Sequence, residues 1–188
     1  MQGLSLPVRV VRSKRKTLAL QVTPEGLVVR APRWATKREI ERFTMEHRDW
    51  IEQHWRKVQE QQRALESVQP LSEEELKKLK KEAAAYIPER VRYYAPLVGV
   101  DYGRITIRAQ KTRWGSCSVE GNLNFNCLLM LTPPEAIDSV VVHELCHRKE
   151  MNHSAEFYKE VLRVFPEYKK WDKWLKKNGQ ALQARIRK

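Results

Sequence analysis

Three of the five histidines lie within eleven residues, in the segment VVVHELCHRKEMNHSAEF (residues 140–157). His143 and His147 are four residues apart, and Glu144 directly follows the first. On a helix, residues four apart lie on the same face, so both imidazoles can point at one position, with Glu144 about 100° away. This is the H-E-x-x-H arrangement, in which two histidines bind zinc and the glutamate is the general base.

The residues around this motif predict a buried helix. The preceding AIDSVVV is largely apolar, and Leu145 and Cys146 lie inside the motif, so the helix is apolar nearly all round. Buried ionisable groups without partners cost several kcal/mol. A metal ion supplies such partners, whereas a surface helix with incidental histidines does not agree with this pattern.

Catalytic zinc usually has three protein ligands and a fourth position for water. His153 follows His147 after five intervening residues, too far for the same helical turn. It serves as the third ligand only if the helix ends soon after His147 and the chain turns back. Asn152, which tolerates a left-handed backbone, is the expected bend, and Ser154 the expected cap of the next helix.

Other residues compete for the third position or resemble ligands. Glu150 and Glu156 are the alternative third ligands. His47 and His54 lie seven residues apart on an apolar and aromatic stripe, and neither has a partner at ligand spacing. We therefore expect these two histidines to be packing residues.

The N-terminal part predicts a small sheet followed by a helix. β-branched and alternating apolar segments end at a proline, and a threonine three residues before a glutamate then resembles a capping box. We expect an antiparallel sheet or hairpin, and then one long helix. The expected strands are 8–12, 17–22 and 27–31, and the expected helix is 37–66.

The C-terminal part predicts the elements that surround the histidines. A linker at 68–72 precedes a charged amphipathic helix that begins at Ser72 and is interrupted near Pro88. Two strands follow, and Pro133 and Pro134 open the histidine helix. The expected strands are 104–109 and 122–131, and the expected closing helices are 155–164 and 167–177. The chain is thus expected to be an α+β protein with domains 1–70 and 71–188, or one continuous domain.

The net charge and the cysteine content indicate which partners and which cellular compartment to expect. With 36 Lys and Arg against 23 Asp and Glu, the net charge is +13, which favours phosphates, acidic proteins or anionic surfaces as partners. Residues 1–24 contain five basic and no acidic residues, and residues 166–188 contain eight basic and two acidic. Nucleic acid, a nucleotide or another polyanion is therefore a candidate partner.

No apolar run approaches the roughly 18 residues of a membrane helix, and the N-terminus lacks a signal-peptide pattern. Cys117, Cys127 and Cys146 are an odd number without a Cys-x-x-Cys pair, so neither a disulfide framework nor a four-thiolate zinc site is expected. We expect a cytoplasmic protein in which the three thiols are small buried side chains.

Three segments resemble the YgjP-like metallopeptidase family of the zincin clan, whose relatives include the SprT-like proteases. These segments are RWGSCS (113–118), GNLNFN (121–126) and HELCHRKEMNHSAEF (143–157). The resemblance implies a zincin-like domain with a small antiparallel sheet, in which His143, His147 and His153 bind one zinc ion and Glu144 is catalytic. In zincins a strand edge beside the active helix often holds an extended substrate, so Arg113 and Trp114 are expected to line the cleft.

The expected activity is hydrolysis. Zinc lowers the pKa of its bound water toward ~7 and polarises the scissile oxygen, while Glu144 transfers the water's proton to the leaving group. A peptide or protein substrate is the first expectation. A phosphoanhydride hydrolase acting on nucleotides is the alternative, supported by the charge and by Arg113. A polyanion-binding protein with a structural zinc is the third, although structural sites usually have four ligands.

Overall fold

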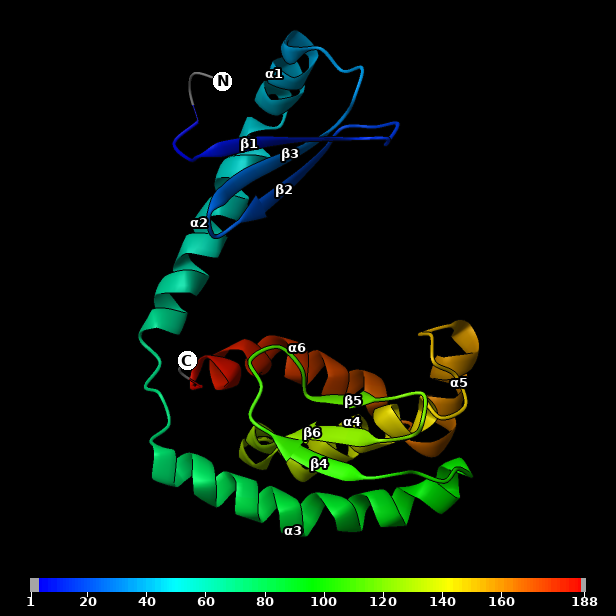
Figure 1. Cartoon of the computed structure of the whole chain (residues 1–188). Helices are drawn as coiled ribbons and strands as arrows, with labels where there is room; N and C mark the ends of the chain where they lie inside the picture. The colour runs from blue at the N-terminus through cyan, green and yellow to red at the C-terminus, as the bar shows by residue number, and fades with distance from the viewer. Residues whose placement is uncertain (1–3, 187–188) are drawn as a thin grey trace. The chain divides into compact units, whose positions relative to one another are not determined.

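The computed structural model describes residues 4–186 and confirms a mixed α+β fold. The chain divides into two compact units, Met1–Ser67 and Val68–Lys188. Unit 1 contains a sheet and two helices, and unit 2 contains a second sheet and the helix with the H-E-x-x-H motif (Figure 1). No helix within residues 4–186 is long and apolar enough to cross a membrane.

The sheet of unit 1 is mixed, whereas an antiparallel sheet was expected. Its strand order is β1-β3-β2, with β1 parallel and β2 antiparallel to β3. The tight turn between β2 and β3 occupies one edge of β3, so β1 pairs with the other edge. Gly26 allows this approach, because a β-carbon there would overlap the carbonyl of Pro7. The strands are β1 (Val8–Ser13), β2 (Ala19–Thr23) and β3 (Gly26–Pro32).

The predicted helix 37–66 is broken into α1 (Lys37–Glu46) and α2 (Arg48–Glu66). The break lies at His47, whose ring Nδ1 contacts the Phe43 carbonyl at 2.9 Å, the carbonyl that its own amide would use in a continuous helix. The amide of His47 bonds to Met45 instead. The expected capping box is present at the start of α1. The helices and sheet enclose a small core of Leu6, Leu27, Val29, Ala31, Ala35, Ile40 and Ile51.

Unit 2 begins with α3 (Glu73–Val98), which starts at a second capping box and ends at the left-handed Gly99. The expected interruption near Pro88 is absent, and the helix also continues through Pro96. A proline inside a helix costs about 3 kcal/mol or more. Buried residues before and after Pro88, including Ile87 and Val91, offset this cost by packing into the main core.

The sheet of unit 2 is also mixed rather than antiparallel. Its order is β4-β6-β5, with β4 parallel and β5 antiparallel to β6. The strands are β4 (Ile105–Arg108), β5 (Gly115–Cys117) and β6 (Leu123–Asn126). The second half of the expected strand 122–131 is a 3-10 helix, η1 (Cys127–Leu131). The Asn126 side chain caps this helix by accepting a hydrogen bond from the Leu128 amide. The sequence did not predict the 3-10 helix, because a short buried apolar run is compatible with either a strand or a helix.

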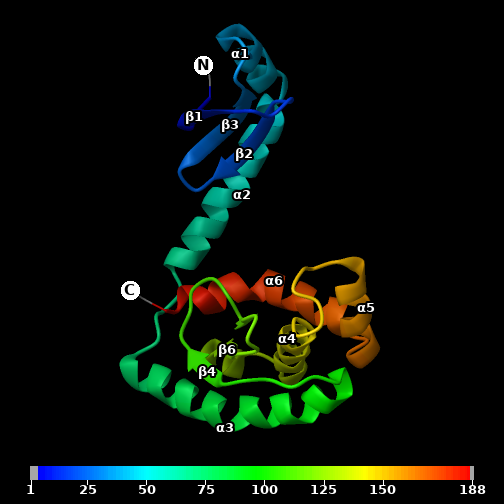
Figure 2. The same cartoon turned by 45° about the vertical axis from the view of Figure 1, so that its right-hand side comes forward.

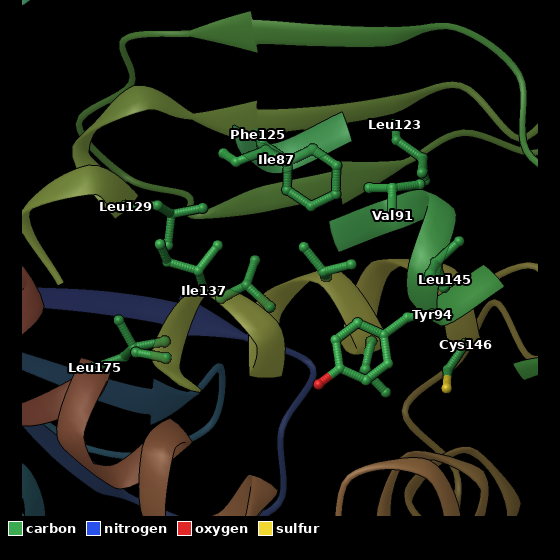
Figure 3. Close-up of a cluster of buried hydrophobic side chains, with 14 of the residues drawn as sticks. Ile87, Val91, Tyr94, Leu123, Phe125, Leu129, Ile137, Leu145, Cys146 and Leu175 are labelled. Carbon is green, nitrogen blue, oxygen red and sulfur yellow. The ribbon is translucent and has the colours of Figure 1, made fainter. Parts of the chain in front are cut away.

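Three helices complete unit 2, namely α4 (Pro134–Cys146), α5 (Ala155–Val164) and α6 (Tyr168–Ala184). The last continues beyond the expected end at residue 177. Figure 2 shows α4 between α3 and α6, which both contact it. Figure 3 shows how α3, β6, η1, α4 and α6 meet in the main core through Ile87, Val91, Tyr94, Leu123, Phe125, Leu129, Ile137, Leu145, Cys146 and Leu175.

Candidate metal centre and catalytic cavity

Helix α4 is fixed on the side facing α3 by a partly buried ion pair. Arg90 donates two hydrogen bonds to Asp138, at 2.7 and 2.8 Å, and the Tyr94 hydroxyl donates a third at 3.1 Å. Asp138 lies about one turn before the H-E-x-x-H motif, and nearly every residue of α4 is buried. The helix therefore has little freedom to rotate, which fixes the directions of its histidines.

The chain turns back directly after α4, as the third histidine requires. The helix ends at Cys146 with His147 as its C-cap, and Ser154 caps α5 by accepting the Phe157 amide. The expectation of a left-handed Asn152 is wrong, because only glycines have positive φ within residues 4–186. The turn instead closes through backbone bonds, including that from the Ser154 amide to the Asn152 carbonyl.

Three ring nitrogens converge at this turn. The Nε2 atom of His143 lies 3.2 Å from that of His147 and 3.0 Å from that of His153. A tetrahedral zinc ion with Zn–N bonds of about 2.0–2.1 Å would separate its nitrogens by roughly 3.3 Å. The three imidazoles are thus already spaced as the ligands of one metal ion, and their donor type suits zinc.

The opposite ring nitrogens have partners that fix the ring orientation. His147 Nδ1 donates to the Glu150 carbonyl at 3.0 Å, which leaves a lone pair on Nε2. His143 Nδ1 lies 2.8 Å from the Tyr168 hydroxyl. Phe157, which is fully buried, stacks on His147 with ring centroids 4.6 Å apart. Such outer partners hold metal-binding imidazoles in place and set their tautomers.

Burial also lowers the basicity of the histidines. The pKa of His143 falls to about 3 because burial disfavours the imidazolium, and the neighbouring histidines and Lys176 add to this effect. Burial likewise lowers the pKa of His147, partly opposed by its bond to the Glu150 carbonyl. Both rings are therefore neutral at pH 7 without metal, which is the form that binds a metal ion.

Glu144 is 5% exposed, and its carboxylate lies against the backbone of β5. A β-carbon on Gly115 would lie 2.6 Å from Oε1 and 2.7 Å from Cγ of Glu144. Glycine at this position therefore leaves the space that the carboxylate occupies. Burial raises the pKa of Glu144 to about 8, while the charge of Arg113 acts in the opposite direction.

A cavity of about 390 Å³ adjoins His143 and Glu144. Its walls come from α4, α6 and the segment that leads into β5, and Arg113 and Trp114 both line it. A β-carbon on Gly179 of α6 would lie 2.9 Å from the Trp114 ring, so glycine there allows the indole to pack closely. On the same wall, Lys176 pairs with Asp172 at 2.6 Å.

The alternative ligands lie apart from this cluster. Glu150 and Glu156 are exposed, and among residues 4–186 the only group of potential metal ligands comprises the three histidines. His47 and His54 belong to unit 1. Cys127 and Cys146 are buried, as expected, whereas Cys117 is half-buried.

Sequence reasoning missed several residues of the site. Tyr168 and Gly179 lie on α6, where nothing in the local pattern relates them to the histidines. Gly115 lies in the segment RWGSCS, which was expected to line the cleft through Arg113 and Trp114. That expectation was the available signal for Gly115. It did not indicate that a side chain at this position would overlap Glu144.

Comparison with known proteins identifies the family. The search of curated proteins finds no match. Two archaeal metallopeptidase zymogens of known structure resemble part of the chain. Abylysin from Pyrococcus abyssi is 24% identical with a TM-score of 0.45, covering 50% of this chain and 96% of its own. Jannalysin from Methanocaldococcus jannaschii is 21% identical with a TM-score of 0.44, covering 49% and 95%.

The family model described as YgjP-like, metallopeptidase domain, matches residues 16–77 and 69–178 and thus spans most of the chain. It includes both the N-terminal sheet and the histidine motif. The chain therefore belongs to the YgjP-like metallopeptidase family, and it is a metal-dependent hydrolase.

Proposed function

We propose that this protein is a zinc-dependent peptidase with one zinc ion bound by His143, His147 and His153 and with Glu144 as its general base. The observation that carries the proposal is the convergence of three Nε2 atoms next to a cavity that His143 and the buried Glu144 both line. Three imidazoles leave one coordination position open, as catalytic zinc sites do, whereas structural sites are usually closed by four ligands.

The residues around the metal position divide the chemistry between them. A bound zinc ion supplies Lewis acidity and lowers the pKa of water toward ~7. Glu144 accepts the proton of the attacking water and delivers it to the leaving amine nitrogen. Tyr168 and the Glu150 carbonyl keep the Nε2 atoms of His143 and His147 directed at the metal.

The substrate is proposed to lie along β5. In the described sheet β5 pairs only with β6, so its other edge can pair with an extended peptide. Gly115 at the start of this strand lies against Glu144, which brings a peptide on the edge close to the general base. The cavity would then accept a substrate side chain, in contact with Arg113 and Trp114.

A phosphoanhydride hydrolase is the second candidate. Two cations lie close to the catalytic residues, because the charge of Arg113 acts on Glu144 and that of Lys176 acts on His143. Positive charge beside an activated water also suits phosphorus chemistry. Lys176, however, is already paired with Asp172, and this reduces the charge available for a polyphosphate.

One experiment separates the two candidates. Zinc-loaded protein is offered casein and unstructured peptides in one set and nucleoside triphosphates in another. We expect cleaved peptides, one zinc per chain, and a rate in Glu144→Gln that is lower by on the order of a hundredfold or more, with zinc retained. Glu150→Gln is the matched control, since this exposed glutamate is close in sequence but outside the cluster.

The outcomes differ clearly. Peptide cleavage by Glu144→Gln at the original rate would refute the proposed base, and loss of zinc from this variant would make Glu144 a ligand. Release of pyrophosphate from nucleoside triphosphates without peptide cleavage would replace the peptidase by the phosphoanhydride hydrolase.

A further inference from the structure

The proposed peptidase site leaves much of the positive charge unused. Residues 9–42 contain ten Lys and Arg and only three glutamates, and all of them belong to unit 1. The zinc site and its cavity are built entirely from unit 2. The charge of unit 1 therefore requires a separate explanation.

Trp34 is the most exposed large aromatic side chain in the described chain, with 70% of its surface accessible. It lies on the short loop between β3 and α1. Arg12 holds this loop, because its Nη1 donates to the carbonyls of Pro32 at 3.3 Å, Arg33 at 3.1 Å and Ala35 at 2.6 Å. The indole is thus exposed on a loop that is tied to the sheet.

A groove of about 360 Å³ lies beside this indole. Its wall includes Thr17, which directly follows a bend at residues 14–16 in which Lys14 and Lys16 are exposed. Two glutamates, Glu39 and Glu46, line the groove. Glu39 accepts hydrogen bonds in the capping box of α1. Glu46 lies 3.7 Å from Arg42. Both carboxylates are therefore engaged by neighbouring groups of unit 1, although Glu39 keeps its negative charge.

We propose that this surface, formed by Trp34 and the cations Lys14, Lys16 and Arg33, binds single-stranded nucleic acid. An unpaired base would stack on the exposed indole, and the three cations would contact the neighbouring phosphates. Stacking platforms flanked by positive charge bind single strands with little sequence preference. An acidic polypeptide would use the same cations but has no base to place on Trp34, so the indole favours nucleic acid.

The test uses the full chain and a fluorescein-labelled oligothymidylate of about 15 nucleotides, with binding followed by anisotropy. We expect Trp34→Ala to weaken binding roughly tenfold, because base stacking supplies part of the affinity. Trp50→Ala is the matched control and should bind as tightly as the unmodified protein. Trp50 is also in unit 1 and is 40% exposed, but it does not line the groove.

A charge-reversal pair tests the phosphate contacts. Lys14→Glu with Lys16→Glu should lower the dependence of the affinity on salt, because fewer counterions are released on binding. The control pair, Lys77→Glu with Lys81→Glu, makes the same change of charge at exposed positions of α3. It should change the salt dependence of the affinity less. Zinc content and peptide cleavage should not change in either pair, which separates this proposal from that of the peptidase.

Three results would overturn the proposal. The first is the absence of salt-sensitive binding, which would make the cations of unit 1 a solvated surface. The second is unchanged affinity in Trp34→Ala, which would place the contact elsewhere. The third is binding of polyglutamate but not of the oligonucleotide, which would identify an acidic polypeptide as the partner.

Discussion

Histidines recur on helices in both units, but only those of α4 are arranged around a common point. His47 and His54, at the start of α2 and within it, each place Nδ1 on the backbone carbonyl four residues earlier, at 2.9 and 2.8 Å. Each ring also contacts the aromatic side chain four residues earlier, with centroids 4.4 and 4.0 Å apart. These two histidines are thus occupied by their own helical turns.

The histidines of α4 have partners from beyond their own helix. His143 Nδ1 meets Tyr168 of α6, and His147 Nδ1 donates to the Glu150 carbonyl in the following turn. Both Nε2 atoms are left to face His153 and one another. The number of histidines on a helix is therefore not decisive. What matters is whether partners outside the helix hold Nδ1 and thereby direct Nε2 to a shared position.

The largest expected effect is the loss of bound zinc when a histidine of unit 2 is replaced, but not when a histidine of unit 1 is replaced. We expect His147→Ala to lose bound zinc and to lower peptide cleavage by more than a hundredfold, because two imidazoles bind zinc far less tightly than three. His54→Ala should keep both properties. Elemental analysis of the dialysed proteins measures the zinc per chain, and zinc loss in His54→Ala would contradict the comparison.

A substitution beside the proposed zinc site should affect turnover while leaving zinc in place. In Gly115→Ala the new methyl group would displace the Glu144 carboxylate, and we expect kcat to fall by tenfold to a hundredfold. Gly103→Ala is the matched control, because its β-carbon would also be crowded, at 2.8 Å from Asn122, but outside the site.

A double variant shows whether Gly115 acts through Glu144. Glu144→Asp shortens the side chain and relieves the overlap, so it should lower kcat less in the Gly115→Ala background than alone. Equal factors in both backgrounds would mean that Gly115 affects the fold rather than the position of Glu144.

Removal of one hydroxyl should weaken metal binding moderately. Tyr168→Phe deletes the partner of His143 Nδ1, and we expect zinc affinity to fall about tenfold, measured by competition with a chelator. Tyr158→Phe is the control, because the Tyr158 ring also lies near a histidine, with its centroid 6.2 Å from that of His153. Within residues 4–186 the Tyr158 hydroxyl forms no hydrogen bond with a histidine. Equal zinc affinity in both variants would show that Tyr168 does not help to hold His143 in its metal-binding orientation.

The last expected effect is a pH dependence of stability in the metal-free protein. The pKa of Glu144 rises from 4.5 to about 8 on folding, so the stability that it contributes is lost as the pH rises toward 8. His143, with a pKa lowered from 6.5 to about 3, costs stability only below pH 6.5. Between pH 6.5 and 8 we therefore expect the free energy of unfolding to fall by about 2 kcal/mol because of Glu144.

The same measurement in Glu144→Gln tests this cause. The amide does not titrate, so its urea unfolding curves should not show the Glu144 contribution between pH 6.5 and 8. An equal decline in both proteins would assign the pH dependence to other groups. His54→Ala should retain the decline of the unmodified protein.

Much of the local structure follows from the sequence alone. The capping box at Thr36, the start of α4 after two prolines and the Ser154 cap of α5 depend on hydrogen bonds between residues close in the chain. The family resemblance rests on contiguous motifs and is confirmed by the family model. The spacing of His143 and His147 likewise fixes their shared helical face, because the helix has 3.6 residues per turn.

Other features depend on contacts that no local pattern encodes. The parallel pairings of β1 and β4, the helix that continues through Pro88 and the 3-10 turn after Asn126 were all decided by packing against distant segments. The same holds for Tyr168 beside His143 and for Gly115 beside Glu144. The sequence determined which side chains can bind a metal ion and transfer a proton. Tertiary structure decided how His143 and Glu144 are directed, because Tyr168 and Gly115 lie on other elements and meet them only in the packed core.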